Sequence, residues 1–419
     1  MLARVGGLAI KVIITNFALS NYLGPERFGI LNYPMAIVTF FMAIAALGLD
    51  GFVTRELLNS PEKKDTILGT AFRMRLIAGI TTLPFLYIVY TVINSHRHLD
   101  TPFSFVLIVG FTSIIQSVNI IDSFFQSRIK GKYIMYVQVA GNIVSAFVKL
   151  GLIILKVSLI WFVYSLLFDA VLIAVGYILI YRQTGNNLSN WKCNGEIAAY
   201  LFKHSWPLAF SAVLVTIYMK IDQAMIASYL DSKQLGIYST VASLSESWYF
   251  IPVAIVTSVF PAIMNAKKTD LARYRLRLQN MYDLMVVISL SIAIIMTFGS
   301  SIIYHIVYKP EFWPGSTVLA VHVWAGIFVF LGSASGQYLI AEGYTKLSML
   351  RTGVGALVNV VLNIYFLPAY GILGAAYATL VAYFVATFFI VLIPKTREQG
   401  LLMFKSLFLI SLAQKIIKR

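Results

Sequence analysis

Apolar runs of membrane-spanning length recur along the whole chain and are separated by short polar breaks. A helix needs about 20 mostly apolar residues to cross roughly 30 Å of hydrocarbon. The pattern therefore predicts twelve transmembrane helices. They cover residues 4–21, 29–49, 76–93, 103–125, 133–155, 159–181, 206–230, 236–264, 282–307, 316–341, 347–367 and 372–393.

The composition agrees with this pattern, because 59% of the 419 residues are hydrophobic and only 12% are charged. That is too little polar surface to cover a soluble globule of this size. We predict an all-α polytopic membrane protein that is not an enzyme, since each stretch outside the spans is too short for a catalytic domain. One cysteine, Cys193, offers no thiol cluster, and we expect neither a metal nor a cofactor.

The net charge of +16 is explained by topology. If the amino terminus is cytoplasmic, the loops and tail on that side hold 24 Lys and Arg residues, against 5 on the other side. By the positive-inside rule this difference places both termini in the cytoplasm. The excess of Lys and Arg therefore does not require nucleic acid as a partner.

The two halves of the chain resemble each other. Residues 22–30 align without gaps on residues 229–237, and the identical pairs include Gly29 and Gly236. Six spans in each half make a parallel repeat, so we expect two six-helix lobes around a central cavity. The predicted parts are an N-terminal lobe (1–185), a cytoplasmic linker (186–205), a C-terminal lobe (206–393) and a basic amphipathic tail (394–419), which lies at the inner surface or forms a short extra span.

Polar side chains inside the predicted spans gather on single helix faces. Asn119 belongs to a stripe of polar residues at steps of three and four in the fourth span, with Asp122 beside it. Asn142 and Lys149 lie on a similar stripe in the fifth span. Such stripes are typical of helix faces that join other helices by hydrogen bonds or line a polar cavity.

Charged residues inside the spans are more informative, because each costs about 2.5–3.5 kcal/mol at mid-span on insertion scales. Pairing, for example of Lys149 with Asp122, would make them structural, whereas unpaired charges facing water would form a cationic cavity. Both interpretations remain open for single residues, and we favour a wet cavity for the set. The set comprises Arg4, Lys11, Asp122, Lys149, Lys220, Asp222 and Glu246.

Residues 244–263, LSESWYFIPVAIVTSVFPAI, resemble the oligosaccharide-lipid flippases of the Wzx type in the MOP exporter superfamily. The similarity extends to residues 22–29, 47–57, 220–223 and 370–376 and covers nearly the whole chain. It implies a MATE-like fold. It also implies alternating-access movement of an undecaprenyl-diphosphate-linked oligosaccharide from the cytoplasmic to the periplasmic leaflet of a bacterial inner membrane, for surface polysaccharide (O-antigen) assembly.

The partners implied are the lipid-linked oligosaccharide, membrane lipids, and the polymerase and glycosyltransferases of the same pathway. A MATE-like ion-coupled exporter of drugs or organic solutes is the alternative, although the excess of bases in the spans favours an anionic cargo.

Bases would neutralise the diphosphate, and amides would bond sugar hydroxyls. We predict Arg4, Lys11, Lys149 and Lys220 for the anion and Asn119, Asn142, Asn359 and Asn363 for the sugar, with Asp122, Asp222 and Glu246 as ion-coupling candidates.

Overall fold

The computed structural model describes residues 17–97 and 99–417, and all regular elements in these ranges are helices. Ten described segments are long and apolar enough to cross a membrane. They coincide with the predicted spans from the second onward, and the last segment, Thr345–Leu392, holds the two predicted spans 347–367 and 372–393. The prediction of an all-α polytopic membrane protein is confirmed. Most of the first predicted span, with Arg4 and Lys11, lies outside the described residues.

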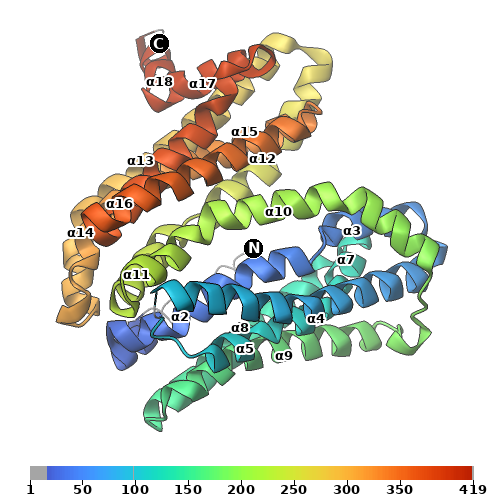
Figure 1. The fold of residues 1–419 in the computed structure, drawn as a ribbon. Coiled ribbons are helices and arrows are strands. Elements are labelled where there is room, and N and C mark those ends of the chain that lie inside the picture. Colours follow the sequence, from blue (N-terminus) through green and yellow to red (C-terminus); the bar gives the residue numbers. More distant parts are fainter. Residues whose placement is uncertain (1–16, 98, 418–419) are drawn as a thin grey trace. The chain divides into compact units, whose positions relative to one another are not determined.

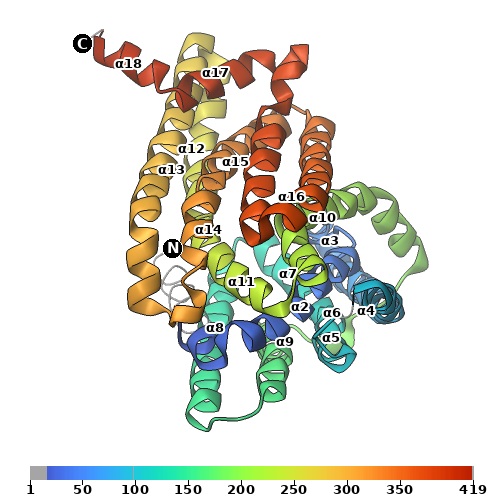
Figure 2. The same ribbon diagram turned by 60° about the vertical axis from the view of Figure 1, so that its left-hand side comes forward.

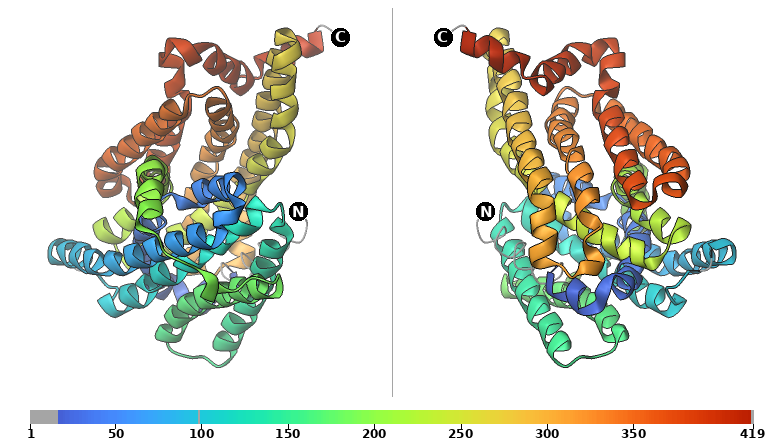
Figure 3. Two further views of the ribbon diagram at one scale, coloured as in Figure 1. Left: turned by 90° about the vertical axis from the view of Figure 1, so that its right-hand side faces the viewer. Right: turned by 90° about the vertical axis from the view of Figure 1, so that its left-hand side faces the viewer.

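The chain divides into two compact units, which meet in the sequence between Gly236 and Ile237. The first unit is drawn in blue to green in Figure 1, and its α8 and α9 form a hairpin that is visible in Figure 3. Its helices are α2 (Ser20–Ala45), α3 (Leu49–Asn59), α4 (Lys64–Arg97), α5 (Phe103–Gly110), α6 (Thr112–Ile115), α7 (Ile120–Ser127), α8 (Gly131–Ile154), α9 (Leu159–Gln183) and α10 (Gly195–Tyr229), with 3₁₀ turns η2 (Pro61–Lys63), η3 (Gln116–Asn119) and η4 (Leu188–Asn190).

The second unit begins within α11 (Ser232–Glu246) and is built from long helices that run side by side. Figure 2 shows α12, α13 and α15 next to one another. Its further elements are α12 (Phe250–Thr269), α13 (Leu271–Val307), η5 (Pro310–Phe312), α14 (Gly315–His322), α15 (Ala325–Ala341), α16 (Thr345–Phe388), η6 (Phe389–Leu392), η7 (Pro394–Thr396), α17 (Arg397–Leu407) and α18 (Ile410–Ile417). A positive φ of 59° at Gly371 breaks α16 between its two predicted spans.

Several helices begin well before the predicted spans, so the prediction of loops in these places is wrong. Residues 51–75 form α3, η2 and the start of α4, and α10 and α13 begin at Gly195 and Leu271. Capping side chains explain two of these starts. The Asn194 side chain accepts a hydrogen bond from the Ile197 amide, and the Asp270 side chain accepts two from the first turn of α13.

The segment between α9 and α10 is fastened to the first unit. Lys64 Nζ donates to Asn186 Oδ1 at 2.7 Å, and the Asn194 amide donates to Thr70 Oγ1 at 3.1 Å. From there α10 packs on α2, α3 and α4, which explains why the first unit extends to Gly236. The lobe boundary at residue 206 rests on the sequence repeat and stays a prediction.

The two glycines that the repeat aligns are in direct contact in the first unit. A Cβ added to Gly29 would overlap the carbonyl group of Ser232, and one added to Gly236 would overlap the carbonyl group of Pro25. The start of α11 therefore crosses α2 at backbone contact distance. Small residues permit such crossings between membrane helices.

The C-terminal tail forms two short helices, α17 and α18, that lie across the end of α13 (Figure 2). Asp283 of α13 is buried and accepts hydrogen bonds from Ser406 Oγ at 2.7 Å and Ser411 Oγ at 2.8 Å, and it pairs with Lys415. These helices have 11 and 8 residues. Each is too short to cross a membrane, and the tail is held by polar contacts of the second unit.

We predict that Gly29→Ala destabilises the protein by about 1–3 kcal/mol, because the new methyl group forces the α2–α11 crossing apart. The measurement is thermal unfolding in detergent. The matched control is Gly51→Ala in α3, where an added Cβ meets no atom within 4 Å. Equal unfolding temperatures for the two variants would contradict the crossing.

Candidate functional site

A small polar pocket lies inside the first unit, where α2 ends and α3 begins against α4, α6 and η3. Its volume is about 70 Å³. Besides Ala45 and Ala46, the lining is polar and consists of Asp50, Arg75, Ser113, Gln116, Ser117 and Asn119. These side chains come from segments that the sequence places in or beside three separate spans, so the pocket is a product of the fold.

A break in the backbone positions Asp50 at the pocket. Leu47 and Gly48 have positive φ values of 54° and 64°, and they turn the chain between α2 and α3. Gly48 is needed there for a second reason, because a Cβ would overlap the backbone of Ala209 in α10. On the other side, Ser123 Oγ of α7 donates to the Asp50 carbonyl oxygen at 3.0 Å and fixes the start of α3.

The helix that carries Asn119 changes its winding at the pocket. The predicted fourth span is divided into α5, α6, η3 and α7, and Gln116 and Asn119 are the first and last residues of η3. In a 3₁₀ helix, side chains three residues apart point in the same direction. This explains why both amides line the pocket, whereas Ser123, on the same predicted stripe, is buried against α3.

Arg75 supplies the positive charge of the pocket, although hydropathy predicts a loop at this position. Its side chain is 4% exposed, and Nη2 lies 2.7 Å from Asp50 Oδ1. The Asp50 side chain is 63% exposed. Within the described part of the chain, Arg75 Nε makes no hydrogen bond, and Nη2 contacts Asp50 without good hydrogen-bond geometry, so the guanidinium keeps donors to spare.

Lys149 forms a second intramembrane ion pair, and its partner is Asp169 in α9, which is not among the predicted site residues. Lys149 Nζ lies 2.6 Å from Asp169 Oδ2 and donates to Ser145 Oγ at 3.0 Å. Lys149 is only 2% exposed. The suggested pairing with Asp122 is therefore replaced by a bond across the α8–α9 hairpin, while Asp122 accepts from Gln126 Nε2 at 2.8 Å.

The other predicted site residues that the structure describes neither line the pocket nor belong to the Lys149–Asp169 pair. Asn142 is half-buried two turns before Lys149 in α8. In α10, Asp222 is buried and accepts from the Gln223 amide, and Lys220 is half-buried. Glu246 is half-buried at the last residue of α11.

Asn359 and Asn363 are buried in α16 of the second unit. Asn363 Nδ2 donates to the carbonyl oxygen and to the side-chain oxygen of Asn359. This arrangement turns the two amides toward each other. Across residues 17–97 and 99–417, no three His, Cys, Asp or Glu side chains gather in a way that could hold a metal ion.

Comparison with known proteins identifies the family. A family model described as "Polysaccharide biosynthesis protein" matches residues 18–314, which is more than half of the chain. The chain belongs to this family. The match includes the pocket, the Lys149–Asp169 pair and the whole of α10 and α11.

Relatives of this family member include two archaeal proteins. The probable flippase AglR of Haloferax volcanii is 22% identical over 408 residues, which cover 91% of this chain and 79% of AglR. An uncharacterized membrane protein, MJ1375, of Methanocaldococcus jannaschii is also 22% identical, with 87% of this chain and 89% of that protein covered.

Solved structures show the same fold at low identity. The lipid II flippase MurJ in an inward closed conformation has a TM-score of 0.72 at 17% identity, with 98% of this chain and 91% of MurJ covered. An inward-facing multidrug resistance MATE family transporter of the MOP superfamily has a TM-score of 0.77 at 12% identity, with 96% of each chain covered. Together with the family model and the flippase-named relative, this shared fold confirms the resemblance to polysaccharide flippases of the MOP superfamily.

We predict that Lys149→Met and Asp169→Leu each destabilise this family member by about 3–5 kcal/mol, because each leaves the other charge buried without its partner. The double variant should recover most of that loss, since no buried charge remains. Thermal unfolding in detergent gives the coupling energy from the four proteins.

The exposed ion pair between Arg275 and Glu398, with side chains 63% and 65% exposed, is the control for this cycle. Its coupling should stay within about 1 kcal/mol. Strictly additive losses for Lys149→Met and Asp169→Leu would show that the buried pair is not an energetic unit.

Proposed function

We propose that this protein is a flippase that moves an undecaprenyl-diphosphate-linked oligosaccharide from the cytoplasmic to the periplasmic leaflet of a bacterial inner membrane. The family match over residues 18–314 carries this proposal. A flippase-named relative aligned over 91% of the chain and a fold shared with a lipid II flippase support it. Polymerase and glycosyltransferases that use or make the same lipid-linked sugar are the expected pathway partners.

The charges of the first unit suit an anionic lipid headgroup. A diphosphate cannot enter hydrocarbon without replacement of its water, because an isolated buried charge costs tens of kcal/mol in the idealised limit. Arg75 and Lys149 are buried cations within membrane-length helices. Together with Lys220 and, outside the described residues, Arg4 and Lys11, they are our candidates for stabilising the anion.

Amide side chains are our candidates for the sugar. Asn119 lines the pocket and Asn142 is half-buried, so both have surface available to a ligand. Asn359 and Asn363 are buried together, and a sugar would reach them only after α16 moves relative to its neighbours. Asp122, Asp222 and Glu246 remain candidates for ion coupling.

The family match favours this proposal over the alternative, an ion-coupled exporter of drugs or organic solutes. Similarity to a MATE transporter at 12% identity reflects the fold alone. Polysaccharide biosynthesis, in contrast, is the description of the matched family.

Reconstitution tests the proposed function. In proteoliposomes loaded with lipid-linked oligosaccharide, a glycosidase added outside should cleave about half of the sugar without the protein and nearly all of it with the protein. The covalent structure of the protected lipid should be unchanged by mass spectrometry. Cleavage that stays at the protein-free level, with efflux of an organic cation, would favour the exporter.

Cys193 provides a test of the proposed orientation, because it is the one cysteine of the chain and it is exposed. In intact spheroplasts, a membrane-impermeant maleimide should label Cys193 only after permeabilisation. Ser158→Cys in a Cys193→Ser background should be labelled at once, since residue 158 is exposed between α8 and α9, on the opposite side. The reverse pattern would place the termini outside the cytoplasm.

A further inference from the structure

Arg75 is arranged more like a binding residue than like one half of a structural ion pair. In the other buried pair of this unit, Lys149 is 2% exposed, contacts Asp169 and adds a hydrogen bond to Ser145. Arg75 is equally buried, but its Asp50 partner has most of its side chain in contact with solvent. A guanidinium has five N–H donors; here, in the described chain, Nε has no hydrogen bond, and Nη2 contacts the Asp50 carboxylate without good hydrogen-bond geometry.

Asp50 is a partner that can be replaced. It lies in the first turn of α3, directly after the backbone break at Leu47 and Gly48. A solvated carboxylate gains little from such a pair, because water stabilises it nearly as well. An anion with more oxygens would satisfy the spare Arg75 donors and release Asp50 to solvent.

The pocket has the size and lining for a phosphate group. A volume of about 70 Å³ is several times the space that one water molecule requires. Ser113, Ser117, Gln116 and Asn119 add hydroxyl and amide donors around Arg75. Phosphate oxygens accept hydrogen bonds from these groups, and a guanidinium binds them in a bidentate manner.

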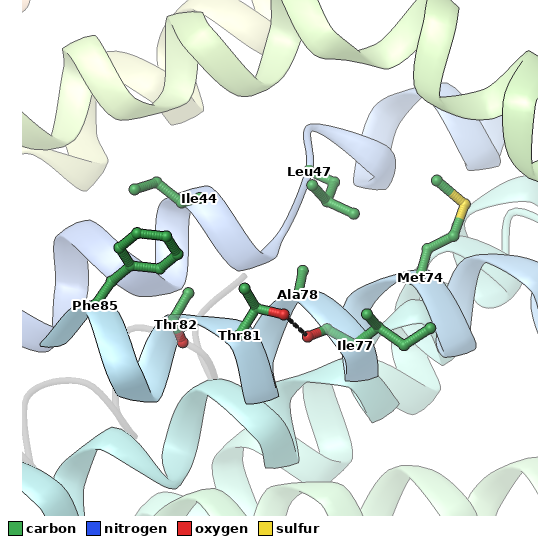
Figure 4. Close-up of a pocket in the computed structure, with 8 residues that line it drawn as sticks. All are labelled: Ile44, Leu47, Met74, Ile77, Ala78, Thr81, Thr82 and Phe85. Atoms are coloured by element: carbon green, nitrogen blue, oxygen red, sulfur yellow. Dashed lines mark hydrogen bonds between the residues drawn. The ribbon is translucent and has the colours of Figure 1, made fainter. Parts of the chain in front are cut away.

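An apolar groove of about 370 Å³ lies beside the pocket, between the end of α2 and α4 (Figure 4). Ile44 and Leu47 line the groove, whereas Ala45 and Ala46 line the polar pocket. Along α4, Met74 faces the groove and Arg75 the pocket. The polar and apolar sites therefore alternate between neighbouring residues at the end of α2, in the turn that follows it, and along α4.

The groove is apolar even though two threonines contribute to it. Thr81 Oγ1 donates to the Ile77 carbonyl oxygen at 2.8 Å, as Figure 4 shows, and Thr82 Oγ1 donates to Gly79 at 2.7 Å. Both hydroxyls thus donate their hydrogen bonds to backbone carbonyl oxygens of α4 rather than to the groove. Ile77 and Phe85 are 64% and 57% exposed, so a hydrocarbon chain has open access to the groove.

We propose that the α2–α4 pair binds the lipid carrier of the substrate in two parts: the Arg75 pocket takes a phosphate of the headgroup in exchange for Asp50, and the groove takes the first isoprenoid units. This inference rests on the proposed function, because it specifies where the carrier binds. The occupant is a polyprenyl diphosphate. In this molecule a phosphate anion is joined to a hydrocarbon chain, just as the polar pocket adjoins the apolar groove.

Binding of undecaprenyl diphosphate to the full-length protein in detergent tests the headgroup site. Arg75→Gln should weaken binding at least tenfold, and Asp50→Asn should strengthen it several-fold because the competing carboxylate is lost. Arg73→Gln is the matched control, since Arg73 is exposed on the same helix two residues away. Unchanged affinity in both folded variants would overturn the proposal, and if Arg75→Gln unfolds, the Asp50→Asn result alone decides.

Two further ligands separate the possible sources of the phosphate. Ala78→Phe fills the groove and should weaken undecaprenyl diphosphate binding without affecting inorganic diphosphate, whereas Ile80→Phe, outside the groove, should change neither. Equal binding of undecaprenyl diphosphate by Ala78→Phe and the wild type would overturn the tail site. Binding of phosphatidylglycerol as tightly as of undecaprenyl diphosphate would mean that ordinary lipid occupies it.

The leaflet assay keeps this inference distinct from the proposed function. A wild-type protein that flips lipid-linked oligosaccharide, together with an Arg75→Gln variant that binds and flips equally well, would refute the Arg75 site and leave the flippase intact. A wild-type protein that binds undecaprenyl diphosphate through Arg75 without flipping would refute the flippase and leave the site.

Discussion

Charge inside membrane-spanning helices is the constraint on which the polar architecture of this protein depends. Both buried cations that the structure describes in the first unit are held against a carboxylate, Lys149 by Asp169 and Arg75 by Asp50. The two pairs differ in how far the anion is removed from water. The Asp169 side chain is 23% exposed and the Asp50 side chain 63% exposed, so an incoming anion displaces Asp50 more readily than Asp169.

Close backbone packing supports this arrangement. Gly48 permits the turn from α2 into α3 against α10, and that turn sets the position of Asp50. Gly29 and Gly236 permit α2 to contact the start of α11. Any side chain at these three positions would separate backbones that are in contact, and would move the pocket along with the helices.

Much of this fold follows from sequence because span length and apolar content are local properties. The break of α16 between its two spans, at Gly371, is an example. Helix starts such as Gly195 and Leu271 were misplaced, since polar caps and charged first turns extend helices beyond the hydrocarbon. Docking of the tail on Asp283 joins residues more than 120 positions apart and has no local signal.

The site was predicted less completely, for a related reason. Asn119 was found because an amide in an apolar span is conspicuous, and by the same criterion Asp169 in α9 could have been found. Arg75 directly precedes the apolar run that begins at Leu76, so hydropathy alone assigned it to a loop. Only tertiary packing shows that it is buried.

The measurement that tests this account most directly is the coupling energy of the Arg75–Asp50 pair with and without undecaprenyl diphosphate, with the Lys149–Asp169 pair measured alongside. A double-mutant cycle isolates such a pairwise energy. We predict that the ligand abolishes the Arg75–Asp50 coupling and leaves the Lys149–Asp169 coupling unchanged. An Arg75–Asp50 coupling that persists with saturating ligand would contradict the account.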